Sequence, residues 1–276
     1  MGRAALRLGM AQPPLSQSIA RLETELGVRL FARGGRKLSL TRAGAAMLED
    51  ARSALAHAKR AEDNARGSLA GTSGELRVGF VSAALYHHLP ILLRRLCEKY
   101  PDITPRLFEM STNEQLAALD RQDIDMGFVH PPLGRAHIFD VTDLPEDELI
   151  AAIPDRGPAQ MATLAELAAC GLILFPESQG PSLRAEIIDA FVRENLRVDI
   201  RQEASRALTM LALVSAGIGA ALLPKSTAQL NFKGVRFVRI AASNKLPRFQ
   251  LSVIARARPR WPVIDTALSL VKNETI

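Results

Sequence analysis

The sequence of 276 residues predicts an α/β protein in two parts that a long helix joins. Residues 1–41 combine short amphipathic helices with two short strands that flank a glycine pair. Residues 42–70 follow a helical pattern that no proline interrupts, and residues 75–276 alternate strands with helices. Such alternation is typical of mainly parallel sheets with helices on their faces.

The first part is organised around a helix that we expect to begin at Gln12. Gly9 ends a preceding helix, and the proline pair after Gln12 suits a first helical turn, where a missing N–H costs nothing. Apolar residues then recur at helical spacing and predict a buried stripe; they are Leu15, Ile19, Leu22 and Leu26. Outward-facing polar side chains could hydrogen-bond base edges and phosphates in a major groove. The expected DNA-contacting positions are Gln12, Pro13, Pro14, Ser16, Gln17 and Arg21.

A basic hairpin is predicted directly after this helix. Gly27 ends the helix, and the segments 28–31 and 37–40 read as two short strands around the glycine pair. Arg33 and Arg36 flank that pair, so the tip of the hairpin can contact phosphate as a wing. An ordinary surface helix and hairpin remains the alternative, because short motifs often match by chance.

The positive charge is concentrated in this part of the chain. Residues 1–66 hold 12 Lys and Arg against 6 Asp and Glu, whereas residues 67–276 hold 23 of each. The whole surplus of +6 therefore lies where phosphate neutralisation would need it. A basic surface that serves only solubility is the alternative.

Three segments carry a specific resemblance: Ala11-Gln12-Pro13-Pro14-Leu15-Ser16, Glu25-Leu26-Gly27-Val28-Arg29-Leu30-Phe31-Ala32-Arg33, and Leu40-Thr41-Arg42-Ala43-Gly44. Together they resemble the winged helix-turn-helix of LysR-type transcriptional regulators, and the likeness runs over essentially the whole chain. The Gln-Pro-Pro-Leu-Ser form is similar to the branch that responds to aromatic-degradation intermediates such as muconates. The resemblance implies a cytoplasmic homotetramer on double-stranded promoter DNA, controlled by a small carboxylate or aromatic-derived effector.

The chain departs from the family pattern in two places. Met1 falls where the second helix of the family's domain has already begun, so we expect a partial winged helix-turn-helix over residues 1–41. If Met1 is the true start, the other helices would expose apolar faces, and DNA binding would be weakened. In that case the chain would act as an effector-binding and dimerisation module without autonomous operator binding. The second departure is Gln17-Ser18, where relatives often carry a basic residue followed by Gln.

The segment 42–70 is predicted to be a linker and dimerisation helix. Thr41 is a good N-cap, and residues at alternating three- and four-residue spacing form a heptad-like seam of mostly small side chains. The seam comprises Leu48, Ala51, Leu55, Ala58, Ala65 and Leu69, with Glu62 interrupting it. A helix packed on its own domain is the alternative.

Residues 75–276 are predicted to form an effector-binding domain. The expected strands are 75–81, 103–109, 124–129, 149–153, 172–175, 198–202, 220–223 and 251–255. The expected helices are 85–100, 113–121, 164–169, 182–195, 206–216 and 263–272. The layout resembles the family's effector domain, which is similar to periplasmic binding proteins with two α/β lobes. Lobe one then takes about residues 75–143 and 246–276, and lobe two about residues 144–245, with crossovers near 138–148 and 241–250.

Ligands of open α/β sheets bind at the carboxyl ends of strands. Three strand ends lead into helix starts that offer hydroxyls and backbone amides to an anion. The resemblance implies that Ser82, Thr112, Pro181 and Ser182 hold a carboxylate effector, as matching positions do in the muconate-responsive branch. The full set of expected effector-binding residues is Ser82, Ala84, Thr112, His130, Pro181, Ser182 and Leu183. Plain helix capping would also explain Ser82, Thr112 and Ser182.

Other function classes find little support in the sequence. No zinc-ligand spacing, nucleotide-binding glycine motif or nucleophile elbow occurs, so we expect no metal, no cofactor and no enzymatic activity. Cys97 and Cys170 lie in apolar helical runs and are predicted to be buried free thiols in a reducing cytoplasm. The longest apolar run, 208–223, is too short and interrupted to span a membrane.

Overall fold

The computed structural model describes residues 1–34, 37–67, 71–133, 138–157, 161–179, 181–241, 245–257 and 260–272. Within the helix 42–67 and at a few other positions, only the backbone is described. The chain divides into two units, residues 1–65 (unit 1) and residues 66–276 (unit 2), and each is considered by itself.

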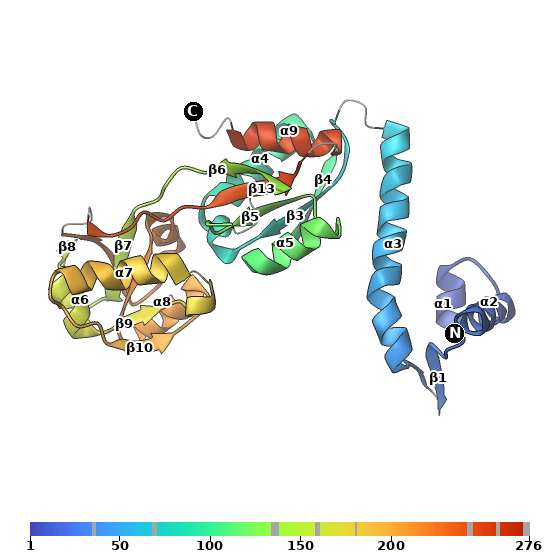
Figure 1. Ribbon diagram of the computed structural model, residues 1–276, viewed down its shortest axis with the longest axis horizontal. Helices are drawn as coiled ribbons and strands as arrows, with labels where there is room; N and C mark the ends of the chain where they lie inside the picture. The colour runs from blue at the N-terminus through green and yellow to red at the C-terminus, as the bar shows by residue number, and fades with distance from the viewer. Residues whose placement is uncertain are drawn as a thin grey trace. The chain divides into compact units, whose positions relative to one another are not determined.

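Unit 1 contains two short helices, a hairpin and most of a long helix (Figure 1). Its elements are α1 (Gly2–Arg7), α2 (Gln12–Leu26), β1 (Phe31–Gly34), β2 (Lys37–Leu40) and α3 (Arg42–Gly67). The prolines occupy the first turn of α2, and Gly27 ends this helix with φ of 68°, a left-handed conformation that glycine adopts without strain. β1 and β2 pair antiparallel, with Phe31 opposite Leu40. The helix and the second strand begin where the sequence predicts, whereas the first strand begins three residues later than expected.

The predicted apolar stripe on α2 is only partly buried. Leu15 and Ile19 are half-buried, but Leu22 and Leu26 remain 37% and 45% exposed. The short helix α1 packs against α2, and its six residues are too few to cover the whole length of the stripe. The expectation of a fully buried stripe is therefore wrong for its second half.

The buried position on α2 is Glu23, a carboxylate. Its Oε1 accepts the backbone N–H groups of Leu30 (2.8 Å) and Phe31 (3.0 Å), and its Oε2 lies 3.2 Å from Arg29 Nη1. These two backbone hydrogen bonds, together with the Arg29 charge, lower the pKa of Glu23 below its ordinary value of 4.5. Glu23 thus ties α2 to the start of the hairpin through charge-assisted hydrogen bonds.

Thr41 caps α3, as predicted. Its hydroxyl accepts the Gly44 N–H at 3.0 Å and donates to the Arg29 carbonyl at 2.6 Å, so one side chain secures both the helix start and the hairpin. Along the predicted seam, Leu48 and Ala51 are half-buried, and Leu55 is 73% exposed within the single chain. The side chains at 62 and 65, and residue 69, lie outside the described residues.

Lobe one of unit 2 is a five-stranded sheet in the order β4-β3-β5-β13-β6 (Figure 1). The strands are β3 (Gly74–Phe80), β4 (Ile103–Glu109), β5 (Met126–Val129), β6 (Phe139–Asp143) and β13 (Ser252–Arg256). The helices are η1 (Ser82–Tyr86), α4 (His88–Lys99), α5 (Thr112–Asp120) and α9 (Pro262–Lys272). β4, β3 and β5 run parallel, whereas β13 is antiparallel to both of its neighbours. The helices α4 and α9 pack together on one face of the sheet, and α5 lies on the other face.

Lobe two is a six-stranded sheet in the order β10-β9-β11-β7-β12-β8. Its strands are β7 (Leu149–Pro154), β8 (Met161–Ala162), β9 (Leu172–Leu174), β10 (Ile200–Glu203), β11 (Ala220–Pro224) and β12 (Val235–Ile240). Its helices are α6 (Leu164–Cys170), η3 (Glu177–Gln179), α7 (Pro181–Arg193), α8 (Ala207–Ser215) and η4 (Lys225–Leu230). The alternation of strands and helices confirms the predicted α/β fold, although β6, β8 and β12 were not expected from the sequence.

Two segments cross between the lobes and are hydrogen-bonded to each other. The N–H of Asp147 donates to the Phe249 carbonyl at 2.7 Å, and the N–H of Phe249 returns the bond at 2.9 Å. The Asp147 carboxylate also accepts the Ser226 N–H at 2.9 Å. Because β6 extends to Asp143, the first crossover begins later than the predicted residue 138.

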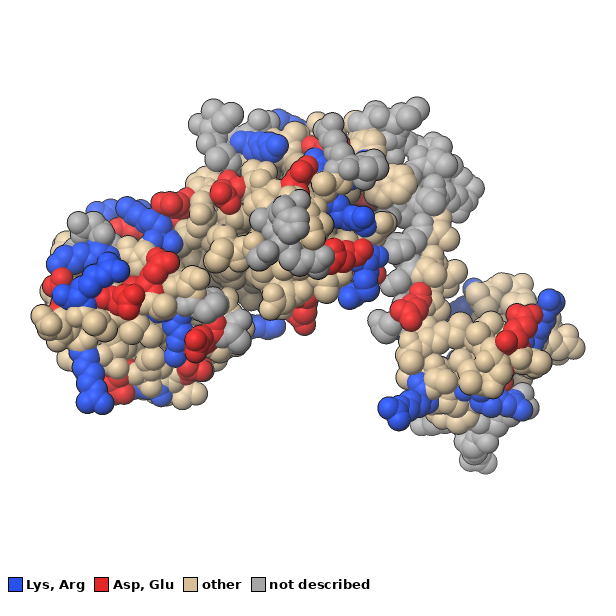
Figure 2. All heavy atoms as spheres, viewed as in Figure 1, with Lys and Arg blue, Asp and Glu red and all other residues tan. Residues whose placement is uncertain are grey.

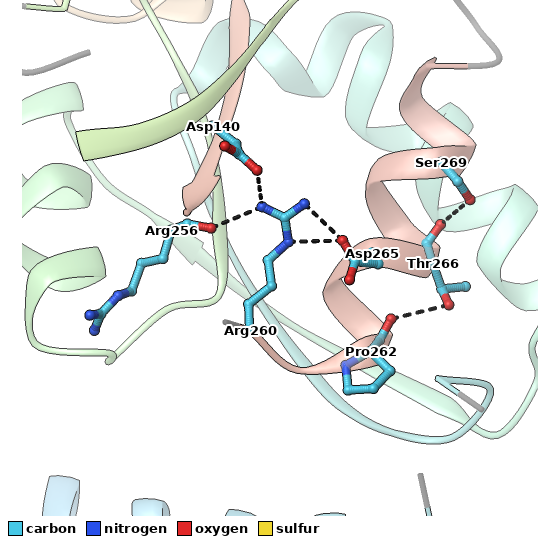
Figure 3. Close-up of polar contacts among 7 residues, drawn as sticks. All are labelled: Asp140, Arg256, Arg260, Pro262, Asp265, Thr266 and Ser269. Carbon is cyan, nitrogen blue, oxygen red and sulfur yellow. Dashed lines mark hydrogen bonds and ion pairs between the residues drawn. The ribbon is translucent and has the colours of Figure 1, made fainter. Parts of the chain in front are cut away.

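The edge of lobe one is secured by the Arg260 guanidinium (Figure 3). Its side chain is only 7% exposed and pairs with Asp265 of α9 (2.9 and 2.7 Å) and with Asp140 of β6, while also donating to the Arg256 carbonyl. Burial lowers the pKa of Arg260, but the hydrogen bonds to Asp140 and Asp265 and their negative charges outweigh it, so the pKa lies above its ordinary value. One buried cation thereby joins α9 to two strands of the sheet.

The cysteine prediction is wrong for Cys97, which is exposed; Cys170 is half-buried, and both are free thiols. The buried face of α4 carries Leu89, Leu92 and Leu96, and Cys97 is turned away because each helical residue rotates by about 100°. A membrane-spanning helix is not found when the described part of the chain is searched.

Candidate functional site

The carboxyl ends of β3, β4 and β5 meet at one edge of the lobe-one sheet. Phe80 pairs with Glu109 of β4 and with Phe128 of β5, so the residues that follow these strands are neighbours. Gln115 on α5 is fully buried behind this edge, and its amide donates to the carbonyls of Met110 (3.1 Å) and Phe128 (3.0 Å). A Cβ at Gly127 would lie 2.4 Å from Gln115 Oε1, which explains why glycine occupies that strand position.

Thr112 and His130 are brought together at this edge, as the strand-end argument predicts. The His130 backbone N–H donates to Thr112 Oγ1 at 3.1 Å. Thr112 does not cap α5; that role belongs to Ser111, whose side chain accepts the Glu114 N–H while Glu114 accepts the Ser111 N–H. The Thr112 hydroxyl therefore faces the next strand end, and capping does not explain it.

His130 carries an imidazole in a poorly solvated position. Its ring meets the ring of Phe249 edge-on, with centroids 5.5 Å apart, and Phe249 belongs to the returning crossover. Burial lowers the pKa of His130 to about 4. The imidazole is therefore neutral near pH 7 and can both donate and accept a hydrogen bond there.

Ser82 joins a second cluster, which includes a residue of lobe two. Its hydroxyl donates to Glu109 Oε1 at 2.6 Å, and the same oxygen lies 3.4 Å from Nη2 of Arg206. Arg206 precedes α8 in lobe two. Tyr86 of η1 lies nearby: burial and the Glu109 charge raise its pKa, and the Arg206 charge opposes this.

Ser82 does not act as a helix cap either. Val81 is the N-cap of η1, and no side chain caps this short helix. Ala84 is fully buried, and its N–H donates to the Val81 carbonyl at 2.9 Å, so this amide is already used inside the turn. The free amide expected at Ala84 is thus not available in this conformation.

The lobe-two candidates lie at the start of α7. Ser182 is exposed and Leu183 is half-buried, whereas the side chain of Pro181 lies outside the described residues. Arg184, one residue later, secures this helix by donating to the Phe175 carbonyl and pairing with Glu203 at 2.7 Å. The convergence of Ser182 and Leu183 with Ser82 in one pocket stays a prediction.

The candidate DNA interface lies on the exposed face of α2. Gln12, Pro13, Pro14 and Gln17 are exposed, and Arg21 is 84% exposed in an ion pair with Glu25 at 2.9 Å. Ser16 differs, since it is half-buried and lines a depression of about 300 Å³ together with Glu23 and Phe31. The side chains of Arg33 and Arg36 at the hairpin tip lie outside the described residues. On the face drawn in Figure 2, Lys and Arg side chains lie along the rim of unit 1.

Sequence reasoning missed Glu109 and Arg206. The rule that points to Ser82, a position at the carboxyl end of a strand, could have found both residues. Glu109 is the last residue of β4, and Arg206 lies between β10 and α8. A carboxylate such as that of Glu109 repels anions, so its residue type alone gives no indication of an anion site.

Two family models match the chain. Residues 1–45 match the bacterial regulatory helix-turn-helix protein of the lysR family, and residues 69–275 match the LysR substrate binding domain. The first model matches the N-terminal part of unit 1, and the second matches nearly all of unit 2.

Several transcriptional regulators are similar to this chain over nearly its whole length. HTH-type transcriptional regulator IlvR of Caulobacter vibrioides is 35% identical over 279 residues, covering 99% of this chain and 92% of IlvR. TcbR of Pseudomonas sp. is 33% identical, covering 99% of this chain and 93% of TcbR, and CatR of Pseudomonas putida is 32% identical with the same two coverages.

A solved structure supports the same assignment. The crystal structure of CbnR, a LysR family transcriptional regulator, superposes with a TM-score of 0.78 at 30% identity, covering 99% of this chain and 93% of CbnR. CbnR has also been solved in complex with its target DNA, and this structure matches with a TM-score of 0.65. The predicted two-part fold and the prediction that this is a regulator rather than an enzyme are confirmed. The chain belongs to the LysR family of bacterial transcriptional regulators, with a helix-turn-helix DNA-binding domain and an effector-binding substrate domain.

Proposed function

We propose that this regulator senses a small organic acid, aromatic-derived or otherwise carboxylate-bearing, at the carboxyl edge of the lobe-one sheet. The observation that carries the proposal is the meeting of Ser82, Thr112 and His130 at one sheet edge, in positions that helix capping does not explain. Hydroxyl donors and a neutral imidazole suit a carboxylate, which accepts several hydrogen bonds. Ser182 and Leu183 of α7 complete the proposed site from lobe two.

The effector site is tested by Ser82→Ala and Thr112→Val in the full chain. We expect both variants to bind benzoate or cis,cis-muconate about tenfold more weakly, because each removes a hydrogen bond to a charged group. Operator affinity measured by fluorescence anisotropy should not change. Thr163→Val is the matched control, since it removes the Thr163–Glu166 capping box of α6 without touching the sheet edge. Loss of operator binding in the Ser82 or Thr112 variants would instead indicate a structural role.

We further propose that α2 reads the major groove of promoter DNA through Gln12, Gln17 and Arg21, with the hairpin tip on phosphate. Arg33→Ala at the hairpin tip should weaken binding to all duplexes by a similar factor and reduce the salt slope by about one. Binding that is not salt-sensitive would contradict the phosphate contact. If the chain binds effector but no duplex, the better description is an effector-binding and dimerisation module without autonomous operator binding.

We infer that α3 pairs with α3 of a second chain, and that dimers join into tetramers in the cytoplasm. Leu55 is 73% exposed on α3, although an amphipathic helix gains stability only by burying its apolar stripe. Leu55→Glu should shift the mass measured by sedimentation towards the monomer. Leu85→Glu, at an equally apolar but 42% exposed position of η1, is the control and should leave the mass unchanged.

A further inference from the structure

A carboxylate of the protein itself occupies the anion-binding groups of the lobe-one edge. Glu109 Oε1 accepts the Ser82 hydroxyl at 2.6 Å and lies 3.4 Å from Arg206 Nη2. Ser82 and Glu109 come from lobe one, whereas Arg206 reaches across from lobe two. The two lobes are therefore connected at Glu109 Oε1, which contacts Ser82 of lobe one and Arg206 of lobe two.

We propose that Glu109 holds the place of the effector's carboxylate on Ser82 and Arg206, and that a small organic acid binds by displacing it. The proposal rests on the proposed function, because it takes the lobe-one edge as the effector site. It adds Arg206 as the cationic partner of the ligand and Glu109 as an internal competitor.

The exposure of the pair favours exchange. The Arg206 side chain is 64% exposed and that of Glu109 is 36% exposed, so neither charge is locked in the interior. Exposed ion pairs contribute little to stability, and losing one to a ligand costs correspondingly little. Arg206 forms an ion pair with Glu109 at 3.4 Å, and it can form an ion pair with the carboxylate of a ligand in the same way.

The exchange also gives the ligand a means of acting on the lobes. Before binding, Arg206 is tied directly to β4 of lobe one through Glu109. After binding, the tie from Arg206 to Ser82 runs through the ligand, whose length sets the separation of the lobes. A ligand shifts a conformational equilibrium only by its different affinity for the two states, and this exchange supplies such a difference.

The same arrangement predicts which ligands are excluded. An uncharged analogue cannot replace the Glu109 carboxylate on Arg206, because it offers no negative charge to the guanidinium. Benzamide, the neutral amide with the shape of benzoate, is the matched probe for this selectivity.

The experiment is isothermal titration of the full chain with benzoate, cis,cis-muconate and benzamide. Glu109→Gln keeps a hydrogen-bond acceptor for Ser82 and removes the competing charge, so we expect carboxylate affinity to rise about two- to fivefold. Arg206→Gln should weaken it by at least about tenfold, because a hydrogen bond between charged groups is lost. Arg206→Lys retains the cation and should recover part of the loss. Benzamide should bind none of these variants better than the original chain.

Glu75 and Arg106 provide the matched control. They form an ion pair of 3.2 Å between β3 and β4 of the same lobe, with side chains 44% and 63% exposed. Glu75→Gln and Arg106→Gln should leave carboxylate affinity unchanged. If the original chain binds a carboxylate but Glu109→Gln binds it equally or less well, the exchange is overturned while the effector site stands. If neither the original chain nor any variant binds a carboxylate, both proposals fail.

Discussion

The two units of this regulator are stabilised in different ways. Within the described part of unit 1, the apolar side chains that are buried are Ala5 and Leu30, and large ones such as Leu6 and Leu8 stay 81% and 63% exposed. Unit 2 buries apolar side chains throughout both sheets and their helices. Unit 1 relies instead on polar ties, which are made by Glu23 and Thr41. Burial of apolar area therefore contributes more to the stability of unit 2 than to that of unit 1, where losing a polar tie should matter more.

The largest effect should come from opening the core of unit 2. Phe191 of α7 is fully buried, and Phe191→Ala should reduce the free energy of unfolding of unit 2 by about 3–5 kcal/mol through lost contacts and a cavity. Trp261, the single tryptophan, reports unfolding of this unit by fluorescence. Val192→Ala is the control, because its side chain is 60% exposed. Equal losses in both variants would contradict a core that is specific to one face of α7.

The two units should lose stability in different pH ranges as the solution is acidified. Burial lowers the pKa of His130 to about 4 from about 6.5, so between these values the unfolded chain binds a proton that the folded chain does not. Unit 2 therefore loses stability as the pH falls from about 6.5 to 4, by up to about 3 kcal/mol. In unit 1 the pKa of Glu23 lies below its ordinary value of 4.5. The contribution of Glu23 to the stability of unit 1 is therefore fully present above pH 4.5 and is lost only as the pH falls through the lowered pKa.

Hydrogen-exchange mass spectrometry, read peptide by peptide over the pH range, measures both windows. Protection in β5 and β13 should decline first, and protection of the Leu30 and Phe31 amides should persist to lower pH. His130→Phe should flatten the first decline and leave the second unchanged. If the His130→Phe chain declines as steeply between pH 6.5 and 4, another group accounts for the acid sensitivity.

The Arg260 clamp tests whether unit 2 also depends on a polar tie. Arg260→Met removes a nearly buried cation and leaves the carboxylates of Asp140 and Asp265, which are 50% and 38% exposed, without it. Because these carboxylates keep contact with water, we expect a loss of about 2 kcal/mol rather than the full cost of a deeply buried pair. Arg121→Met is the control, since its pair with Asp123 at 2.7 Å involves an arginine that is 63% exposed. Denaturant unfolding followed by Trp261 fluorescence measures both variants.

The sequence predicts the fold of unit 2 well because its strands carry their own pattern. Segments such as 126–129 and 220–224 are continuously apolar and fully buried, and glycine or proline marks many of their ends. The strand β6 was missed because Phe139–Asp143 holds two apolar residues among three polar ones and lies where a crossover between the lobes was expected. Its place in the sheet depends on β13, which follows it by about a hundred residues in the chain and is therefore invisible to local reasoning.

Only those residues of the candidate site that follow the ends of strands could be predicted from the sequence. Ser82, Thr112 and His130 follow three parallel strands, and that rule alone brings them to one edge. Which hydroxyl caps a helix was not predictable, because Ser111 and Thr112 are adjacent and equally suited by type. The link from Glu109 to Arg206 was also out of reach, since it depends on how one lobe faces the other.

The smallest effect should come from the cap of α3 in unit 1. Thr41→Ala removes the acceptor for the Gly44 N–H and the donor to the Arg29 carbonyl, and loss of such a cap costs about 1 kcal/mol. In unit 2 the same treatment of Ser111, which caps α5, should go almost unnoticed in local opening because the core of lobe one holds that helix. We therefore expect hydrogen exchange to rise measurably over residues 41–48 in Thr41→Ala, and hardly at all over residues 112–120 in Ser111→Ala. Equal increases in both helices would show that unit 1 is held by more than its polar ties, and would break the contrast between the two units.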